Sequence, residues 1–484
     1  MVYRAAGGGT AYPTAFGAES GVAAETVAVA NVNVIGKADL TTQGTIGGLQ
    51  VKTCNPGKQA PQNEFSVAVN PANPLNLVAG ANDYRLYESS ENRYDGSGGF
   101  YRSIDGGKKW TAGYLPGLVR GNSVAPGIYQ SAGDPAVAAG PNNVFWYANI
   151  VFNRPPGARP AARPTEEANG IAVSRSSDGG ATWVTSFVDQ SPAGGTVFND
   201  KEWIAAHPKN PLVAYVTWTK FTGGSSRLVY SGTTNGGSTW TAAAPITSRA
   251  SNQGSVGWVG ADGRLHVVWE TYGFSRNSVA YAVRSGSKFG ATRLLATIDD
   301  VPSPFEWAGS TGFRTNSFPA FALDGSILHV VWPNSNGVDA DVLYICSTDA
   351  GSTWSTPVAI VDDLSDQFFP WVAARDGVVA VSYLDHNGET GSSYHASMVT
   401  SADGGATWSM PIRLSTKSSD PSAGNLFKYP DCIPSFIGDY TGIALGADRR
   451  AHPFWMDIRV GNSPGDPVSR ADQDPYTASV VISQ

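Results

Sequence analysis

One octet recurs five times along the chain, and no other feature constrains the fold as strongly. The copies are SIDGGKKW (103–110), SSDGGATW (176–183), TTNGGSTW (233–240), STDAGSTW (347–354) and SADGGATW (401–408). The gaps between their tryptophans are 73, 57, 114 and 54 residues, and the longest is twice 57. One copy is therefore missing or degenerate near residue 297. The segment SGSKFG at 285–290 lies in that gap and has lost both the Asp and the Trp.

The octet predicts a tight hairpin turn. Asp or Asn before Gly-Gly suits a turn with positive φ, and the carboxylate can accept backbone N–H groups within it. The closing Trp is expected to pack between neighbouring sheets. These properties make the octet a folding device rather than a catalytic element.

Two apolar strands precede each octet or its degenerate copy. The first strands lie at 63–71, 133–141, 199–208, 252–263, 316–325, 367–377 and 438–450. The second strands lie at 76–85, 144–154, 212–221, 265–273, 328–336, 378–387 and 451–459. A third strand leads into the octet and a fourth follows it, and four antiparallel strands per repeat are typical of a propeller blade. The sequence thus predicts an all-β fold, a seven-bladed β-propeller.

The seventh unit lacks a fourth strand of its own. It has strands at 438–447, 451–458 and 474–483, and then the chain ends. The segment 26–36 or the segment 47–54 can supply the missing strand and close the ring. We expect residues 1–25 to be a flexible segment and residues 26–484 to be one propeller domain.

Composition agrees with many short strands and limits the partners. The chain has 56 Gly, 31 Pro and 14 Trp, and only 15% of its residues are charged. The net charge of −7 and the absence of a basic run argue against nucleic acid, and no apolar run is long enough to span a membrane. Few lysines with much Gly, Ser, Thr and Trp favour a secreted or cell-surface protein whose signal peptide is not in this chain.

The three cysteines predict one disulfide. Cys54 and Cys432 each come shortly before the first strand of a blade, the first and the seventh, which adjoin in a closed ring. A Cys54–Cys432 bond would reinforce the closure. Cys346, inside a third strand, is expected to be a buried free thiol.

The five octets resemble the Asp-box, or BNR repeat, of sialidases and their relatives, over almost the whole chain from about residue 60. The resemblance implies a sialidase-like propeller, a scaffold that also carries other glycosidases, polysaccharide lyases and binding proteins. Sialidases open their first blade with Arg-Ile-Pro and usually have six blades. Here the first blade reads Asn63-Glu64-Phe65-Ser66, and seven blades are expected. A sialidase-like glycosidase with a different substrate is therefore the expectation.

Substrate-binding residues are expected at the rim where second strands end. A polar residue recurs there, at Asp83, Asn153, Thr219, Glu270, Asn334, Asp385 and Asp457. Arg85, Arg154 and Arg459 stand beside this position in three adjacent blades, under the long loops 86–98, 155–169 and 460–474. Arginine suits carboxylate or sulfate recognition, so an anionic oligo- or polysaccharide is the expected partner. The alternative is that Arg85 and Arg459 pair with their own rim carboxylates.

Catalytic candidates lie at the starts of first strands. They are Asp134, the run Asp200-Lys201-Glu202-Trp203, and the pair Asp439-Tyr440. The resemblance implies a Tyr nucleophile, matched in position by Tyr440. Its activating base would be Glu270 or Glu202, and the acid would be Asp83, Asp95 or Asp134. Lys201, Asp83, His386 and Asp457 are further candidates for substrate contact.

Two other functions stay open. His386 and His395, with a Tyr and an Arg, are the equipment of a polysaccharide lyase. A glycan- or protein-binding propeller without catalysis is the third reading. No cofactor is expected and no cluster has convincing metal spacing, although Asp466–Asp474 could hold a structural Ca²⁺.

Overall fold

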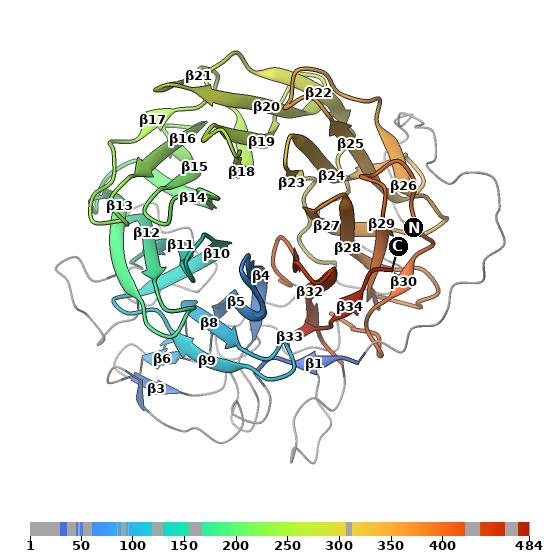
Figure 1. Ribbon diagram of the computed structural model, residues 1–484, viewed down its shortest axis with the longest axis horizontal. Helices are drawn as coiled ribbons and strands as arrows, with labels where there is room; N and C mark the ends of the chain where they lie inside the picture. The colour runs from blue at the N-terminus through green and yellow to red at the C-terminus, as the bar shows by residue number, and fades with distance from the viewer. Residues whose placement is uncertain are drawn as a thin grey trace.

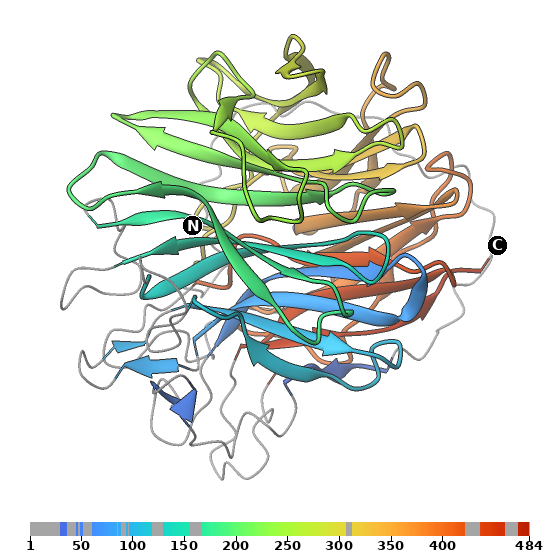
Figure 2. The ribbon, with the colours of Figure 1, turned by 60° about the vertical axis from the view of Figure 1, so that its left-hand side comes forward.

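The computed structural model is a ring of seven antiparallel sheets around a central axis (Figures 1 and 2). It describes residues 30–35, 45–46, 49–51, 61–84, 86–88, 93–94, 96–118, 129–153, 167–305, 312–421, 436–459 and 473–483. The predicted flexible segment 1–25 lies outside these residues. No helix in the described part of the chain is long and apolar enough to cross a bilayer.

Each blade runs from an inner strand at the axis to an outer strand at the circumference. Blade 1 is β4 (Gln62–Asn70), β5 (Asn73–Asp83), β8 (Ser97–Ser103) and β9 (Thr111–Tyr114), and blade 2 is β10 (Ser131–Ala139), β11 (Phe145–Phe152), β12 (Asn169–Ser176) and β13 (Val184–Ser191). Blade 3 is β14 (Val197–Ala206), β15 (Ala214–Thr222), β16 (Ser225–Thr233) and β17 (Ala244–Pro245). Blade 5 is β23 (Ala320–Asp324), β24 (Ile327–Ser335), β25 (Ala340–Ser347) and β26 (Val358–Val361), and blade 6 is β27 (Gln367–Arg375), β28 (Val378–Asp385), β29 (His395–Ser401) and β30 (Ile412–Arg413).

Blade 4 replaces the octet with a short hairpin, as the doubled gap predicts. Its strands are β18 (Asn252–Val259), β19 (Leu265–Thr271) and β20 (Asn277–Ser285), with β22 (Arg293–Ile298) as the outer strand. The end of β20 folds back on β21 (Lys288–Phe289), pairing Arg284 with Phe289. The prediction of seven blades with one degenerate turn is confirmed.

An N-terminal strand closes the ring. Blade 7 contains β31 (Gly442–Leu445), β32 (Arg450–Asp457), β33 (Asp474–Thr477) and the short β34 (Val480–Val481). Its outermost strand is β1 (Val32–Asn33), which pairs with β33 at Val32↔Thr477 and Asn33↔Tyr476. The other predicted closing segment instead supplies β3 (Leu49–Val51) to a separate small sheet with β2 (Thr45–Ile46), β6 (Leu86–Glu88) and β7 (Arg93–Tyr94).

The octets form hydrogen-bonded turns. In the first copy, Ser103 Oγ donates to Asp105 Oδ1 and accepts the Gly107 amide, and the Lys108 and Lys109 amides donate to Asp105 Oδ1. The same Ser/Thr–Asp/Asn arrangement recurs at Asp178, Asn235, Asp349 and Asp403. Both glycines of the turn have positive φ, 77° and 85° in the first copy, which only glycine adopts without strain.

The residue that closes each turn packs against an aromatic ring of the preceding blade. The pairs are Trp110–Phe454, Trp183–Phe100, Trp240–Trp146, Phe289–Tyr230, Trp354–Tyr281 and Trp408–Tyr344, with ring centroids 5.0–6.2 Å apart. Phe289 therefore takes the place of the missing Trp in blade 4. These contacts join blades that share no hydrogen-bonded strands.

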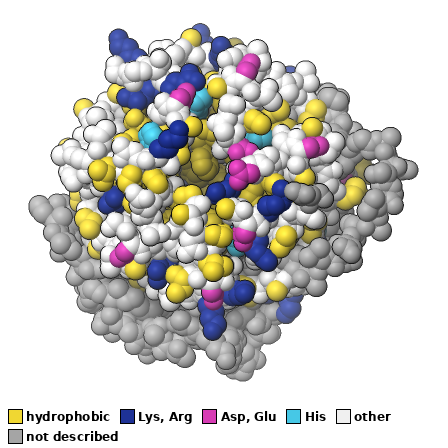
Figure 3. Space-filling view, in the orientation of Figure 1, with side chains coloured by type: hydrophobic (Ala, Val, Ile, Leu, Met, Phe, Trp, Pro, Cys, Tyr) yellow, Lys and Arg dark blue, Asp and Glu magenta, His cyan; other side chains and the backbone are white. Residues whose placement is uncertain are grey.

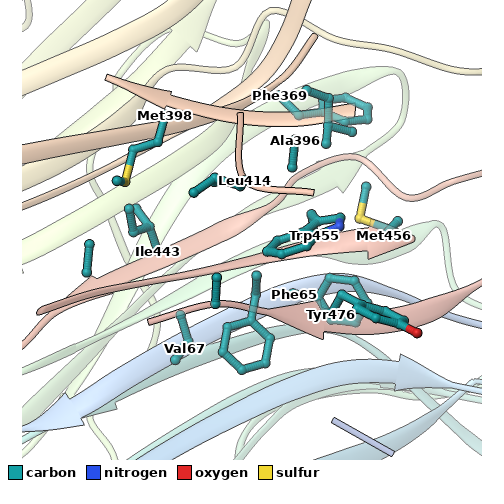
Figure 4. Close-up of a cluster of buried hydrophobic side chains, with 14 of the residues drawn as sticks. Phe65, Val67, Phe369, Ala396, Met398, Leu414, Ile443, Trp455, Met456 and Tyr476 are labelled. Atoms are coloured by element: carbon teal, nitrogen blue, oxygen red, sulfur yellow. The ribbon is translucent and has the colours of Figure 1, made fainter. Parts of the chain in front are cut away.

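Apolar side chains fill the spaces between adjacent sheets. The largest core cluster runs through blades 6, 7 and 1 and thus spans the closure. Figure 4 shows Phe65 and Val67 of β4 facing the strands that carry Ile443 and Trp455. Burial in this cluster holds the first and last blades together.

We expect Trp183→Ala to lower the free energy of unfolding by about 3–5 kcal/mol, because it leaves a cavity between blades 1 and 2. Trp183 is 9% exposed, whereas its neighbour Val184 is 76% exposed. Val184→Ala is the matched control and should change stability by less than about 0.5 kcal/mol. Chemical denaturation of both variants checks this. Equal effects would contradict the role given to the Trp.

Candidate functional site

Backbone bulges aim side chains of the inner strands at the axis. The pairing of the two inner strands shifts at Glu64, Asp134, Lys201 and Phe369, which have φ of 56°, 52°, 51° and 48°, and at Gly254. A non-glycine residue with left-handed φ costs of order 1–3 kcal/mol, and such strain clusters at functional sites. Three of these bulges belong to blades 1, 2 and 3. They bring two carboxyl groups and one ammonium group to the same level of the channel.

Lys201 joins side chains from three other blades. Its Nζ lies 2.6 Å from Asp439 Oδ2 and 3.3 Å from both Glu64 Oε1 and Asp134 Oδ2. Burial would lower the pKa of Lys201, but Asp134, Asp439 and Glu64 outweigh it and raise that pKa well above its usual value. The ammonium stays charged, and its side chain is only 9% exposed.

Arg314 makes the second ion pair with Asp439. Its Nε and Nη2 donate to the two oxygens of Asp439 at 2.7 and 2.6 Å, and Asn316 donates to the Asp439 backbone oxygen at 2.8 Å. Both residues come from the segment before β23, in blade 5. Although burial opposes it, the charges of Lys201 and Arg314 lower the pKa of Asp439. Asp439 is therefore held ionised.

A pocket lies in the channel beside these charges. Its empty space is about 530 Å³, part of it open to solvent. Asp134, Lys201, Glu202, Asn316, Asp439 and Tyr440 line it together with Trp203, Phe318, Phe369 and Trp371. The ring centroid of Trp371 lies 5.3 Å from that of Trp203 and 5.7 Å from that of Tyr440, with the planes tilted by 39° and 38°, so aromatic rings from blades 3, 6 and 7 meet across the channel. Figure 3, viewed along the ring axis, shows the centre hollowed and walled mainly by apolar side chains.

Glu202 has the opposite electrostatic environment from Asp439. Neither of its carboxyl oxygens has a hydrogen-bond partner among the described residues, and the residue is 4% exposed. Burial, followed by the charge of Asp134, raises the pKa of Glu202 well above its usual value. Burial and Asp134 likewise raise the pKa of Asp200 to about 7. The pocket lining thus includes two carboxyl groups whose pKa values are shifted in opposite directions, that of Glu202 upward and that of Asp439 downward.

Tyr440 lies in the pocket, at the position that the resemblance implies for a nucleophile. Its hydroxyl donates to the backbone oxygen of Pro135 at 3.1 Å, and Lys201 Nζ lies 5.3 Å from its ring centroid. Burial and the nearby charges of Glu64, Asp134 and Glu202 raise the pKa of Tyr440 well above its usual value. In this arrangement the phenol is a packed and hydrogen-bonded side chain rather than an activated one.

Other predicted site residues lie away from the pocket lining. Asp83 is buried in blade 1 and accepts hydrogen bonds from Tyr101 and Tyr114. Glu270 accepts a hydrogen bond from Asn277, and burial beside Asp300 raises the pKa of Glu270 to about 9. His386 Nδ1 lies 2.7 Å from the Ser393 backbone oxygen.

Arg459 has the pairing that the sequence left as an alternative. Its guanidinium donates to both oxygens of Asp457, at 2.6 and 2.5 Å, and to Thr416 and Asn31 at 3.0 Å. Its Cζ also lies 4.1 Å from the centroid of Tyr476. These partners make Arg459, which is 7% exposed, part of the interior of blade 7.

Several predictions lie outside the described residues. They concern Arg85, Arg154, Asp95, the Cys54–Cys432 bond and residues 466–472 of the acidic stretch. Cys346 is a free cysteine but is partly exposed, not fully buried as expected. Within the described ranges, no group of three or more His, Cys, Asp or Glu side chains is arranged to hold a metal ion.

The sequence reasoning missed Arg314, Asn316 and Trp371. Arg314 and Asn316 lie at the start of the fifth first strand, so the rule that selected Asp134 and Asp439 could have selected them too. Trp371 was hidden within an apolar run, and only the ring geometry brings it against Trp203 and Tyr440.

Comparisons with solved structures show similarity in the fold. No family model matches the chain, and neither does any curated protein. A Dyadobacter fermentans protein of unknown function has a TM-score of 0.45 at 12% identity, over 87% of this chain and 95% of that one. A Trypanosoma rangeli sialidase bound to 2,3-difluorosialic acid has a TM-score of 0.45 at 13% identity, over 78% and 59%. A Penicillium chrysogenum α-L-arabinanase with arabinobiose has a TM-score of 0.43 at 12% identity, over 87% and 93%.

We expect Lys201→Met to lower the free energy of unfolding by about 3–5 kcal/mol at pH 7, because it leaves buried carboxylates without their counter-charge. Since Lys201 lowers the pKa of Asp439, its contribution is present at neutral pH and is lost as pH falls. Because the pKa of Asp439 is lowered below its usual value, the loss caused by the substitution should stay constant from pH 8 to about pH 5 and shrink only as pH falls below about 4.

Lys220→Met is the control for this experiment. Lys220 pairs with Asp189 at 2.8 Å but is 29% exposed, so its loss should cost about 1 kcal/mol or less. Urea unfolding from about pH 2.5 to pH 8 measures both variants, since the pKa of Asp439 is lowered and the range must extend below the usual value of an aspartate. A Lys201→Met effect that is small or independent of pH would refute the role of the ion pairs.

Proposed function

We propose that this protein is a glycoside hydrolase. Glu202 would be its general acid and Asp439 its ionised carboxylate. The observation that carries the proposal is that the pocket has two carboxyl groups whose pKa values are shifted in opposite directions. Burial raises the pKa of Glu202, whereas Lys201 and Arg314 lower that of Asp439. Two carboxyl groups with opposite pKa shifts are the usual equipment for cleaving a glycosidic bond.

The reaction follows from these two groups. Glu202 would give its proton to the glycosidic oxygen as the bond from that oxygen to the anomeric carbon breaks. The negative charge of Asp439 would stabilise the positive charge that develops on the sugar ring. Water would then add to the anomeric carbon, and its proton would restore Glu202. The aromatic rings of Trp371, Phe318 and Tyr440 offer apolar surface for the faces of sugar rings.

The products formed from a panel of glycans distinguish a hydrolase from a lyase and from a binding protein. A panel of polysaccharides and aryl glycosides should include sialosides and arabinan, on which the sialidase and the arabinanase named above act. New reducing ends without new ultraviolet absorbance support a hydrolase, because a lyase also releases reducing ends. New ultraviolet absorbance from an unsaturated uronate would indicate the lyase, and binding without any product would indicate the non-catalytic propeller.

We expect Glu202→Gln and Asp439→Asn each to lower kcat about 10²–10⁴-fold on the substrate that the panel identifies. Tyr440→Phe should keep most of the activity, since its hydroxyl only donates to a backbone oxygen. The pH dependence of kcat/KM should be bell-shaped, falling at high pH as Glu202 ionises and at low pH as Asp439 gains a proton.

Circular dichroism of each variant serves as the folding control. Loss of activity in Tyr440→Phe with Glu202→Gln still active would reject this assignment in favour of a tyrosine nucleophile.

We also propose that Arg85 and Arg154 bind an acidic group on the glycan, and that the protein is secreted or displayed on the cell surface. An exported, carbohydrate-active protein accords with the composition, and the sequence puts these two arginines just after the predicted ends of second strands in neighbouring blades, where they would suit a carboxylate or sulfate.

Arg85→Ala and Arg154→Ala should each raise KM for an acidic glycan about tenfold to a hundredfold and leave the melting temperature unchanged. Arg459→Ala should instead lower the melting temperature, because it leaves Asp457 buried without its partner. Kinetics on acidic and neutral glycans, with thermal melts, measure both effects. Equal KM values for acidic and neutral glycans in wild type would reject the anionic preference.

A further inference from the structure

A loop of blade 4 presents two exposed aromatic side chains. Residues 272–276 join β19 to β20 at the rim where second strands end. Within them Tyr272 is 38% exposed and Phe274 is 111% exposed. A Phe side chain that lies entirely in water gains nothing from burial. The position of Phe274 next to a second, partly exposed ring is therefore a candidate binding surface.

The loop is fixed by its own hydrogen bonds. The Tyr272 amide donates to the Ser251 backbone oxygen at 2.8 Å, and the Gly273 amide donates to Asn277 Oδ1 at 3.2 Å. Asn277 Nδ2 in turn donates to Glu270 at 2.9 Å and to Asp300 at 2.6 Å. The exposed rings therefore sit on a braced support, which lowers the entropy lost when a ligand binds.

Tyr272 is also connected to the pocket. Its hydroxyl donates to Gln253 Oε1 at 3.4 Å, and Gln253 Nε2 donates to Asp200 Oδ2 at 3.1 Å. Asp200 directly precedes Lys201, the centre of the ion-pair cluster. Gln253 and Asp200 each directly precede a residue of the pocket lining, Gly254 and Lys201, so the hydrogen bonds from Tyr272 lead to the residues next to the pocket wall.

We propose that Tyr272 and Phe274 form an outer sugar-binding subsite, so that the protein takes an extended glycan whose chain continues out of the pocket onto blade 4. This inference rests on the proposed function. A glycan suits both the pocket and the loop as a ligand. The pocket has carboxyl groups and aromatic rings, and the loop has two aromatic rings. The apolar C–H face of a pyranose or furanose ring packs on such rings while its hydroxyl groups remain in water.

The test measures binding as a function of glycan length. The full chain carrying Glu202→Gln, which should bind without turnover, is titrated with mono- and disaccharides and with longer oligosaccharides of the same sugar. The set consists of arabino-oligosaccharides and sialylated oligosaccharides. The second substitution is Phe274→Ala or Tyr272→Ala. Ile104→Ala is the matched control, because Ile104 is an exposed apolar residue of an octet turn and is 63% exposed.

We expect Phe274→Ala to weaken binding of the longer oligosaccharides about threefold to thirtyfold, as removal of part of an aromatic contact does. Binding of mono- and disaccharides should not change, and Ile104→Ala should have no effect on any length. The result is overturned if Phe274→Ala and Tyr272→Ala leave long-chain binding intact, or weaken short and long glycans equally.

The two proposals fail in different ways. If short glycosides are hydrolysed and kcat/KM does not rise with chain length, the outer subsite is refuted and the proposed hydrolase activity is retained. Failure to bind or cleave any glycan of the set would refute both the proposed hydrolase activity and the outer subsite.

Discussion

The buried ammonium of Lys201 is the interaction on which the centre of this ring depends. It lies between Glu64 of blade 1, Asp134 of blade 2 and Asp439, just before the inner strand of blade 7. Carboxyl groups so close together disfavour each other's ionised form at low dielectric, and it is the charges of Lys201 and Arg314 that lower the pKa of Asp439 in spite of its burial. Lys201 and Arg314 make the cluster compatible with folding, and the same charges set which carboxyl group of the pocket is ionised.

The bulges of the inner strands explain why these groups meet. In a regular strand successive side chains alternate between the faces of the blade, and those of the inner strand point into the packing between sheets. A bulge inserts one residue and turns its side chain toward the channel. Glu64, Asp134 and Lys201 occupy that inserted position in three consecutive blades, at the cost of a left-handed backbone that glycine alone would adopt easily. Seven copies of one blade can thus carry different chemistry at a single repeated position.

The sequence predicts the fold far better than the site, and the reason is physical. The octet acts through local hydrogen bonds and one aromatic contact with the preceding blade, so its spacing reveals six blades, the degenerate fourth turn included, and the repeated pair of apolar strands adds the seventh. The site depends on contacts across the channel between residues more than a hundred positions apart. The starts of first strands supplied the candidates Asp134, Lys201, Glu202 and Asp439, which line one pocket, and their roles stay a prediction. The ends of second strands supplied the candidates Asp83 and Asp457, whose side chains bond to Tyr101 and Trp455 inside the blades. Second strands lie one position farther from the axis than first strands, so the side chains at their ends face the neighbouring strands and not the channel.

The same contrast explains how seven similar sheets can produce one asymmetric pocket. In blades 1, 2 and 3 the bulge carries a charged residue, whereas in blades 4 and 6 it is Gly254 and Phe369. The charged bulges adjoin Asp439 through the ring closure, and the apolar ones leave the opposite wall to Trp371 and Phe318. Polar side chains of the pocket therefore come from blades 2, 3, 4, 5 and 7, and aromatic ones from blades 3, 5, 6 and 7. A ligand that suits both kinds of side chain has hydrogen-bonding groups at its edges and apolar faces, which is the chemistry of a sugar ring and the basis for seeking a glycan first.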